Sequence, residues 1–159
     1  MVSHHPDYWG HLADEQRAEG RLSEDLCKTA DGLYFVRCVC ILPLVGGPEP
    51  HVQLGVWGSL SEANFNRYVE TFEDNDQSKL GEMTSWFSNE IVQFPGSRGL
   101  PAWVVPQDAR QRPLIEIHES DHPLYWAQRN GIRYADALAI VHNESAPILP
   151  VDGLQRPGE

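Results

Sequence analysis

The residues of this chain with the most recognisable chemistry lie at His118-Glu119-Ser120-Asp121-His122, which matches the pattern H-E-x-x-H. On a continuous helix, this spacing presents two imidazoles to one zinc ion while the glutamate activates a bound water. Here an alternating strand pattern leads directly into His118, and Pro123 is typical of a helix start. The five residues should therefore span a strand end and a helix cap, which disfavours a zinc site. A metal-dependent hydrolase or acid-base enzyme using His118, Glu119 and His122 stays as the alternative function, and no catalytic residue is assigned.

A second candidate set lies around the helix that is expected to begin near Pro123. His122, Trp126 and Arg129 are spaced i, i+4 and i+7, so they share one helix face, and Asp121 stands at its N-terminal end. These four residues are predicted to form a binding surface. They could equally form a structural cluster, in which Asp121 caps the helix and Arg129 pairs with a nearby acid. Both interpretations remain open.

A third candidate is the acidic loop that contains Glu73, Asp74 and Asp76. The spacing of its oxygen-bearing side chains is similar to that of a calcium loop. However, Lys79 stands where the sharp turn of such a loop requires glycine, and Ser85 stands where a bidentate glutamate is required. The loop is therefore predicted to be a solvated surface that takes part in binding, without a metal.

The charge of the chain favours a basic partner. It has 12 Lys and Arg against 23 Asp and Glu, which gives a net charge of −11. This charge repels phosphate backbones and anionic lipid, so neither nucleic acid nor a membrane is the expected partner. The expected function is a soluble acidic binding protein for a protein partner, and one concrete version is an immunity-type protein that neutralises a basic toxin.

Location and cofactors follow from what the pattern does not contain. No apolar run approaches the ~20 residues needed to cross a bilayer, and the first residues lack the pattern of a signal peptide, so a cytoplasmic protein is expected. The three cysteines, Cys27, Cys38 and Cys40, form no C-x-x-C pair. Cys38 and Cys40 should share one face of a strand as buried thiols. No cofactor and no metal is predicted.

The best determined elements are a strand over residues 51–57 and a helix that follows it. Apolar residues alternate along the strand, and Phe65, Tyr68, Val69 and Phe72 then form a helical stripe. Ser59 and Glu62 fit a capping box, which predicts that the helix begins at Leu60. The apolar run 33–42, ended by Pro43, should pair antiparallel with the strand at 51–57.

The remaining pattern predicts a compact domain. Helical spacing is expected from Met83 to Ile91, an edge strand at 102–105, a strand at 114–118, a helix from Pro123 to Gly131 and a last helix over 134–141. The predicted fold class is α+β, with a small antiparallel sheet built from two hairpins and helices packed on it. Residues 1–144 should form a single domain, and residues 145–159 a flexible tail rich in Pro and Gly.

Several of these stretches resemble a known bacterial family, the domain of unknown function DUF2199. They are Gly55 to Phe65, Arg112 to Ile115, Asp121 to Leu124 and Gln128 to Ile132, together with Asp25 to Cys27 and Tyr34 to Arg37. The resemblance runs from about residue 6 to residue 141. Members often begin with a cysteine-rich segment that this sequence does not show, so the resemblance implies no zinc role. It implies the domain and its extent, and no particular activity.

Overall fold

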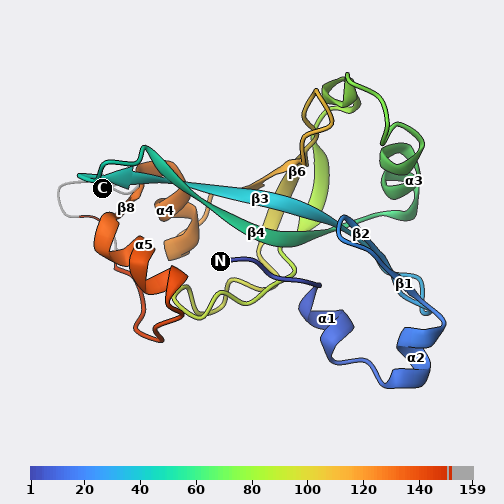
Figure 1. The fold of residues 1–159 in the computed structure, drawn as a ribbon, viewed down its shortest axis with the longest axis horizontal. Coiled ribbons are helices and arrows are strands. Elements are labelled where there is room, and N and C mark those ends of the chain that lie inside the picture. The colour runs from blue at the N-terminus through green and yellow to red at the C-terminus, as the bar shows by residue number, and fades with distance from the viewer. Residues whose placement is uncertain (150, 152–159) are drawn as a thin grey trace.

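The computed structural model describes residues 1–149 and 151 of the chain and shows a mixed α/β fold (Figure 1). Within these residues there are five α-helices and a curled, mostly antiparallel sheet, so the mixture of helix and antiparallel sheet is as predicted. The elements, in chain order, are α1 (Asp7–Gly10), α2 (Asp14–Ala18), β1 (Arg21–Leu22), β2 (Leu26–Lys28), β3 (Tyr34–Val45), β4 (His51–Leu60), α3 (Glu62–Glu70), the 3-10 helix η1 (Gln77–Leu80), β5 (Met83–Trp86), β6 (Pro101–Val105), β7 (Leu114–Ile117), α4 (Pro123–Asn130), β8 (Ile132–Arg133) and α5 (Tyr134–Val141).

The antiparallel hairpin of β3 and β4 forms a long ribbon through the middle of the molecule (Figure 1). The pairing was predicted, but both strands are longer than expected, and Pro43 does not end β3. The backbone nitrogen of Leu44 bonds to the carbonyl of Pro50, 3.0 Å away, so the nitrogen of Pro43 faces the other edge of the strand. That edge pairs with other strands at Val39 and Leu44, and Pro43 lies between these contacts. Pro43 therefore costs no hydrogen bond in the ladder.

The sheet is larger than the predicted pair of hairpins. One edge of β3 pairs with β4, and the other pairs in succession with β2, β7 and β8, of which the last two are parallel to it. Strands β7, β6 and β5 follow in antiparallel order. The strand predicted at 102–105 is therefore not an edge strand, because β6 lies between β5 and β7.

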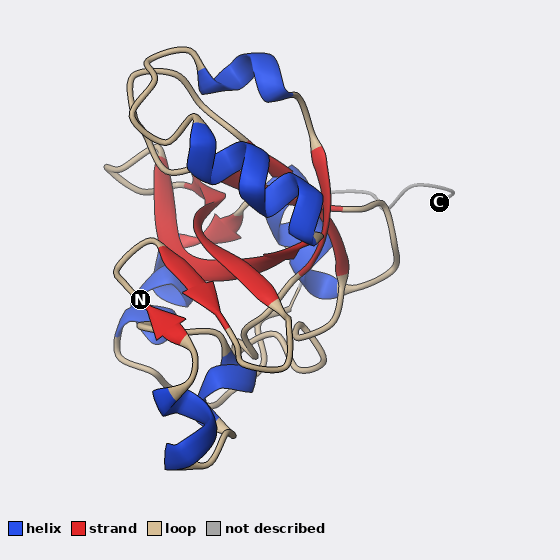
Figure 2. Ribbon diagram, turned by 90° about the vertical axis from the view of Figure 1, so that its right-hand side faces the viewer, coloured by secondary structure: helices blue, strands red, loops and turns tan. Residues whose placement is uncertain are grey.

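The sheet is curled (Figure 2). Strand β5, at the end of the sheet order, is thereby brought against β4. Gly58 of β4 forms an antiparallel bridge with Phe87, directly after β5. A Cβ atom at position 58 would lie 2.8 Å from Ser85 Oγ and 3.0 Å from Ile115 Cδ1. The absence of a side chain at Gly58 thus allows the two ends of the sheet to approach each other.

Helix α3 begins two residues later than predicted, because strand pairing continues as far as Leu60. The capping residue is Ser61, whose Oγ accepts a hydrogen bond from the backbone nitrogen of Asn64 at 3.2 Å. The prediction of Ser59 as the cap was therefore wrong. The predicted stripe is partly buried: Phe65 packs against Tyr34 with ring centroids 5.0 Å apart.

The helix predicted from Met83 to Ile91 is also wrong. Residues 83–86 form strand β5, with Met83 and Ser85 buried and Thr84 and Trp86 exposed. The apolar residues do have helical spacing, but β6 supplies an antiparallel partner, and tertiary pairing overrides the local pattern. Ile91 is buried within the irregular segment that connects β5 to β6.

Two apolar clusters lie on the sheet. The main one includes Cys38 and Cys40, which are fully buried as predicted. The smaller one lies under the N-terminal segment and contains Trp9, Cys27, Phe35 and Trp57. Among the described residues, no helix combines the length and the apolar character that are needed to cross a bilayer.

The C-terminal part begins with α5, which occupies the residues predicted for the last helix and buries Ala137 and Ile140. Of the predicted tail, residues 145–149 and 151 are described, and here Ile148 is buried and its backbone nitrogen donates to the carbonyl of Gln93 at 3.0 Å. The rest of the predicted tail lies outside the described residues.

Candidate functional site

His122, a member of both predicted sets, is the capping residue of helix α4. Its Nδ1 accepts a hydrogen bond from the backbone nitrogen of Leu124 at 3.0 Å. The proton of a neutral ring is then on Nε2, which lies 2.9 Å from the carbonyl oxygen of Pro95 and donates to it. Both ring nitrogens are thus engaged in the structure. In the alternative structural cluster Asp121 was the cap, but His122 takes this role and Asp121 is exposed.

His118 lies at the other end of the H-E-x-x-H pattern, directly after β7. Its ring packs on Trp103 with centroids 4.5 Å apart, and its Nε2 is buried without a hydrogen-bond partner within residues 1–149 and 151. Glu119 is exposed. Because a strand end separates the two histidines, the pattern does not present them to one point. Among the described residues, no three His, Cys, Asp or Glu side chains are grouped as metal ligands.

The predicted binding face on α4 does not converge either. Trp126 is only 3% exposed and lines a small cavity with Phe94 and Ile148. Arg129 is exposed, and its Nη1 donates to the hydroxyl of Tyr125 at 3.2 Å. Trp126 and Arg129 therefore face different surroundings, although their spacing places them on one helix.

The predicted acidic loop between α3 and η1 is solvated. Glu73 pairs with Arg110 at 3.5 Å, and Asp76 pairs with Lys79 at 3.1 Å. Asp74 is also exposed. Such exposed pairs contribute little to stability, so the loop is free to present its negative charge to solvent.

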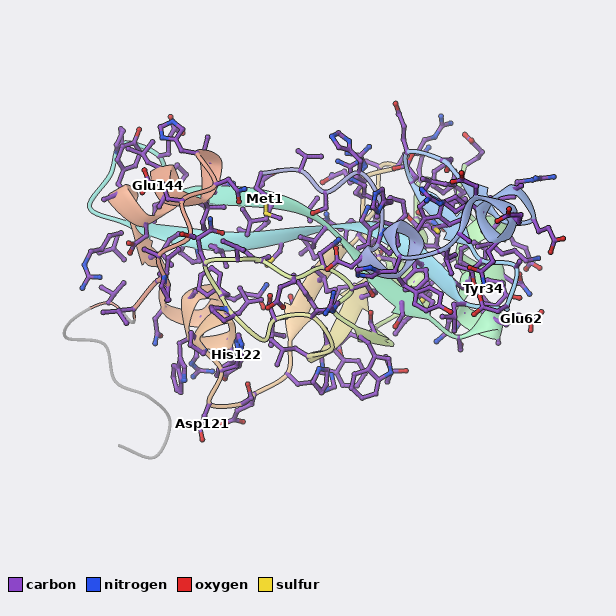
Figure 3. All side chains as sticks on the ribbon, turned by 90° about the horizontal axis from the view of Figure 1, so that it is seen from below. Met1, Tyr34, Glu62, Asp121, His122 and Glu144 are labelled. Atoms are coloured by element: carbon purple, nitrogen blue, oxygen red, sulfur yellow. The ribbon has the colours of Figure 1, made fainter. Side chains whose placement is uncertain are left out.

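A large open cleft of about 830 Å³ lies on the molecule, and none of the predicted binding residues lines it. It lies at the end of the ribbon where β3 begins and β4 ends. Figure 3 shows Tyr34 and Glu62 at this end, with Asp121 and His122 near α4 at the other. The aromatic residues of the cleft are Tyr8, Tyr34, Phe35, Trp86 and Phe87. Its main polar residues are Ser59, Glu62, Arg98 and His118. We call this site the aromatic cleft.

The aromatic cleft exposes large apolar side chains to water. Trp86 is 59% exposed, and Leu33 and Tyr8 beside it are also exposed. Trp86 points outward because β5 alternates, with Ser85 directed inward. Its backbone nitrogen donates to Ser59 Oγ at 2.8 Å, which fixes the strand end that carries the indole. Exposed apolar side chains gathered at one concave site are typical of a binding surface.

Carboxylates stand at the rim of the aromatic cleft. The hydroxyl of Tyr8 donates to Asp31 Oδ2, and this bond raises the pKa of Tyr8 above its ordinary value. The hydrogen bonds from Thr29 and Tyr8 lower the pKa of Asp31. Burial, followed by the charge of nearby Glu62, raises the pKa of Tyr34. The rim thus combines aromatic faces with negative charge, a combination that suits a cationic group.

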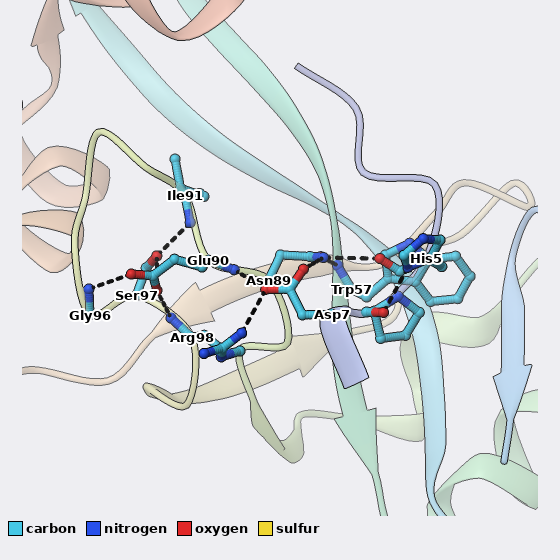
Figure 4. Close-up of polar contacts among 10 residues, drawn as sticks. His5, Asp7, Trp57, Asn89, Glu90, Ile91, Gly96, Ser97 and Arg98 are labelled. Atoms are coloured by element: carbon cyan, nitrogen blue, oxygen red, sulfur yellow. Dashed lines mark hydrogen bonds and ion pairs between the residues drawn. The ribbon is translucent and has the colours of Figure 1, made fainter. Parts of the chain in front are cut away.

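A network of buried polar groups attaches the N-terminal segment to the β5–β6 connection (Figure 4). Asp7 accepts hydrogen bonds from the backbone nitrogen of Glu90 at 2.6 Å and from Asn89 Nδ2 at 3.1 Å. Asn89 Oδ1 in turn accepts from the backbone nitrogen of Trp57 at 2.8 Å. Asp7 precedes Tyr8, so this network holds one wall of the cleft against the sheet.

The side chain of Glu90 organises the loop that follows it. Its two carboxylate oxygens accept hydrogen bonds from the backbone nitrogens of Gly96 and Arg98, each at 2.8 Å, and Ser97 Oγ adds a third donor at 3.3 Å. Burial alone would raise the pKa of Glu90, but these donors and the charge of Arg98 outweigh it, so the pKa lies below its ordinary value. The carboxylate therefore shapes the loop that brings Arg98 to the cleft.

The aromatic cleft was not predicted from the sequence. Of the residues that were predicted as candidates, only His118 lines the cleft. The residues of the cleft come from α1, β3, β4, α3, β5, the β5–β6 connection and the end of β7, which are dispersed along the chain. One local signal was available: polar residues Ser88, Asn89 and Glu90 follow directly on Trp86 and Phe87. A cluster of Ser, Asn and Glu within an apolar run indicates a hydrogen-bonded connection rather than a helix.

The curled sheet, its five helices and the open cleft define a mixed α/β protein with a concave site at one end of its central hairpin. The chain belongs to the family DUF2199, described as an uncharacterized protein conserved in bacteria, whose model matches residues 1–132. The resemblance found in the sequence is thereby confirmed. Neither a curated protein nor a solved structure matches the chain. The matched region contains every residue of the aromatic cleft named above.

Proposed function

We propose that this protein is a non-catalytic binding protein that holds a segment of a basic protein partner in the aromatic cleft. The observation that carries the proposal is the 59% exposure of Trp86 at the mouth of a cleft of about 830 Å³. Tryptophan at a concave site often anchors a partner, because it buries a large area at low entropic cost. An immunity-type protein that neutralises a basic toxin is the concrete version.

The chemistry of the cleft supports a cationic segment. The aliphatic stem of Lys or Arg can pack on Tyr34 and Trp86, while its charged end reaches Glu62 or Asp31 at the rim. The chain already shows one such contact, since Lys28 Nζ lies 5.7 Å from the centre of the Tyr34 ring. The net charge of −11 would steer a basic protein toward this surface.

Binding is favoured over hydrolysis by the arrangement of the alternative residues. His122 is engaged as a helix cap, whereas His118 lines the aromatic cleft. A general base and a metal ligand set need side chains that converge on one reacting atom. The three cysteines are free thiols, which supports a reducing cytoplasmic location as part of the same proposal.

The test is capture of partners from the source cells, followed by binding measurements with the purified partner. Trp86→Ala should raise the Kd at least about tenfold, since a central anchor of this kind contributes more than about 1.4 kcal/mol. Leu138→Ala is the matched control, because Leu138 is an exposed apolar residue on α5, outside the cleft. Equal affinity of the Trp86→Ala and wild-type proteins would refute the cleft as the binding site. Turnover of a small molecule that depends on His122 would refute the binding function.

A further inference from the structure

Within residues 1–149 and 151, Arg37 is a buried cation that forms no ion pair with a carboxylate. It is 8% exposed and lies on β3, where Phe35 and Val39 are two positions away on either side. Its Nη1 donates to the backbone carbonyl of Glu24 at 3.4 Å, a long bond, and its Nε is buried without any acceptor within residues 1–149 and 151. Buried guanidinium groups are normally paired, because an unpaired buried charge is costly. Arg37 therefore has a buried Nε–H donor that no acceptor among the described residues satisfies.

The backbone leaves room for this guanidinium. Gly55 of β4 lies beside it, and a Cβ atom at this position would come within 3.2 Å of Arg37 Nη2. The N-terminal residues cover the same place: Ser3 donates to the carbonyl of Gly55 at 2.7 Å, and Gly55 donates to the carbonyl of Met1 at 3.0 Å. Arg37 is thus held between two backbone segments rather than extended into solvent.

A second guanidinium lines the same cavity. Arg112 and Arg37 both border a space of about 530 Å³, together with His4, Ser23 and Glu24. Arg112 Nε donates to Asp25 Oδ1 at 2.9 Å, which leaves its terminal nitrogens without another hydrogen bond within the described part of the chain. Burial, followed by the charge of Arg112, lowers the pKa of Arg37, and the charges of Asp25 and Glu24 oppose this only in part.

We propose that Arg37 and Arg112 together bind an oxyanion, the group shared by phosphate and carboxylate ligands, in this cavity. The terminal nitrogens of the partly exposed Arg112 are donors at the cavity, and the buried Arg37 Nε–H becomes the second donor when the Arg37 side chain turns toward the bound anion. Guanidinium groups suit this role because their planar donors match two oxygens of one anion. A bound oxyanion would give Arg37 Nε its missing acceptor and would offset the repulsion between two like charges. The site is separate from the aromatic cleft and does not rest on the proposed function.

The experiment is a titration of the ¹⁵N-labelled protein with inorganic phosphate, sodium acetate and sodium chloride at matched ionic strength. The readout is the Arg37 Nε–Hε signal, together with Tm. Phosphate, acetate or both should shift this signal downfield with saturation, because the proton gains an acceptor, while chloride should not. Saturation with phosphate alone assigns a phosphate ligand, and saturation with acetate alone assigns a carboxylate ligand.

Three variants test the site: one should weaken oxyanion binding, one should strengthen it and one should leave it unchanged. Arg112→Gln should weaken oxyanion binding at least about fivefold, since one of two charged donors is lost. Asp25→Asn should strengthen it, because the carboxylate that competes for Arg112 is removed. Arg110→Gln is the matched control, since Arg110 pairs with Glu73 and borders a different cavity. All three side chains lie at least partly at the surface, so these variants should fold.

The proposal is overturned by any of four results. The first is a non-saturating response that chloride reproduces. The second is equal oxyanion binding by wild type and Arg112→Gln. The third is a wild-type Arg37 Nε–Hε signal that does not move with either oxyanion. A stability gain that Arg110→Gln loses as fully as Arg112→Gln would indicate general screening of surface charge, and would also overturn it.

Discussion

Ser59 Oγ accepts a hydrogen bond from the backbone nitrogen of Trp86, 2.8 Å away, and so joins the end of β4 to the end of β5. The two residues are 27 positions apart in the chain. The bond lies where the curled sheet meets itself, and it fixes the backbone that presents the most exposed aromatic side chain of the cleft. A serine expected to cap a helix thus acts as a connection between strands.

Ser59→Ala should lower the free energy of unfolding by ~1 to 2 kcal/mol, because the Trp86 N–H loses its acceptor. Denaturant unfolding measures this loss. Ser61→Ala is the comparison, since it removes a helix cap with a cost of ~1 kcal/mol but does not contact β5. Only Ser59→Ala should change the fluorescence of Trp86 in the folded state. Unchanged stability and fluorescence would show that the bond does not position β5.

Phe65→Ala should cost ~3 to 5 kcal/mol of stability, because it removes a buried ring that packs on Tyr34. Val69→Ala, at a 40% exposed position of the same helix, is the control and should cost less than about 1 kcal/mol. Thermal or denaturant melts give both values. A loss below about 1 kcal/mol for Phe65→Ala would mean that α3 does not depend on this stripe.

Stability should fall on acidification through Glu90. Its pKa is lower in the folded state than its ordinary value, so the unfolded chain binds the proton more tightly. The contribution is complete above the ordinary pKa of glutamate and is lost as the pH falls through the folded value. Urea melts between about pH 7 and 3 should show a steeper acid decline for wild type than for Glu90→Gln. Glu82→Gln, at an exposed position, should retain the wild-type slope; parallel curves for Glu90→Gln would contradict the prediction.

Purified protein should contain no stoichiometric zinc. Both ring nitrogens of His122 are engaged in hydrogen bonds, and His118 lies across a strand end from it. A structural zinc site needs about four ligands at tetrahedral geometry. Elemental analysis is the direct measurement. One equivalent of zinc that disappears in His118→Ala or His122→Ala would favour the metal-dependent enzyme instead.

Association with a basic partner should be fast and sensitive to salt, because exposed carboxylates steer the encounter and salt screens them over ~8 Å at physiological strength. Reversal of charge at Glu73, Asp74 and Asp76 should lower the association rate more than it raises the dissociation rate. Trp86→Ala should act mainly on dissociation. Binding kinetics at two salt concentrations test both. A salt-independent association rate would argue against a role for the acidic surface.

The local sequence pattern was sufficient to predict those helices and strands whose ends are marked by their own residues. Alternation predicted the pairing of β3 with β4. Pro123 and Gly131 marked the ends of α4, and the last helix was placed at the residues it occupies. These features depend on short-range periodicity and on the backbone preferences of Pro and Gly, so they can be read before any partner is known.

Tertiary structure alone decided the rest. Residues 83–86 have helical spacing, yet they form a strand because β6 lies beside them. Tyr8, Tyr34 and Trp86 form one cleft, and Arg37 and Arg112 line one cavity, although each set is dispersed along the chain. A sequence pattern records which residues are neighbours in the chain, whereas a binding site depends on which strands pair and how far the sheet curls, and these are set by packing across the whole molecule.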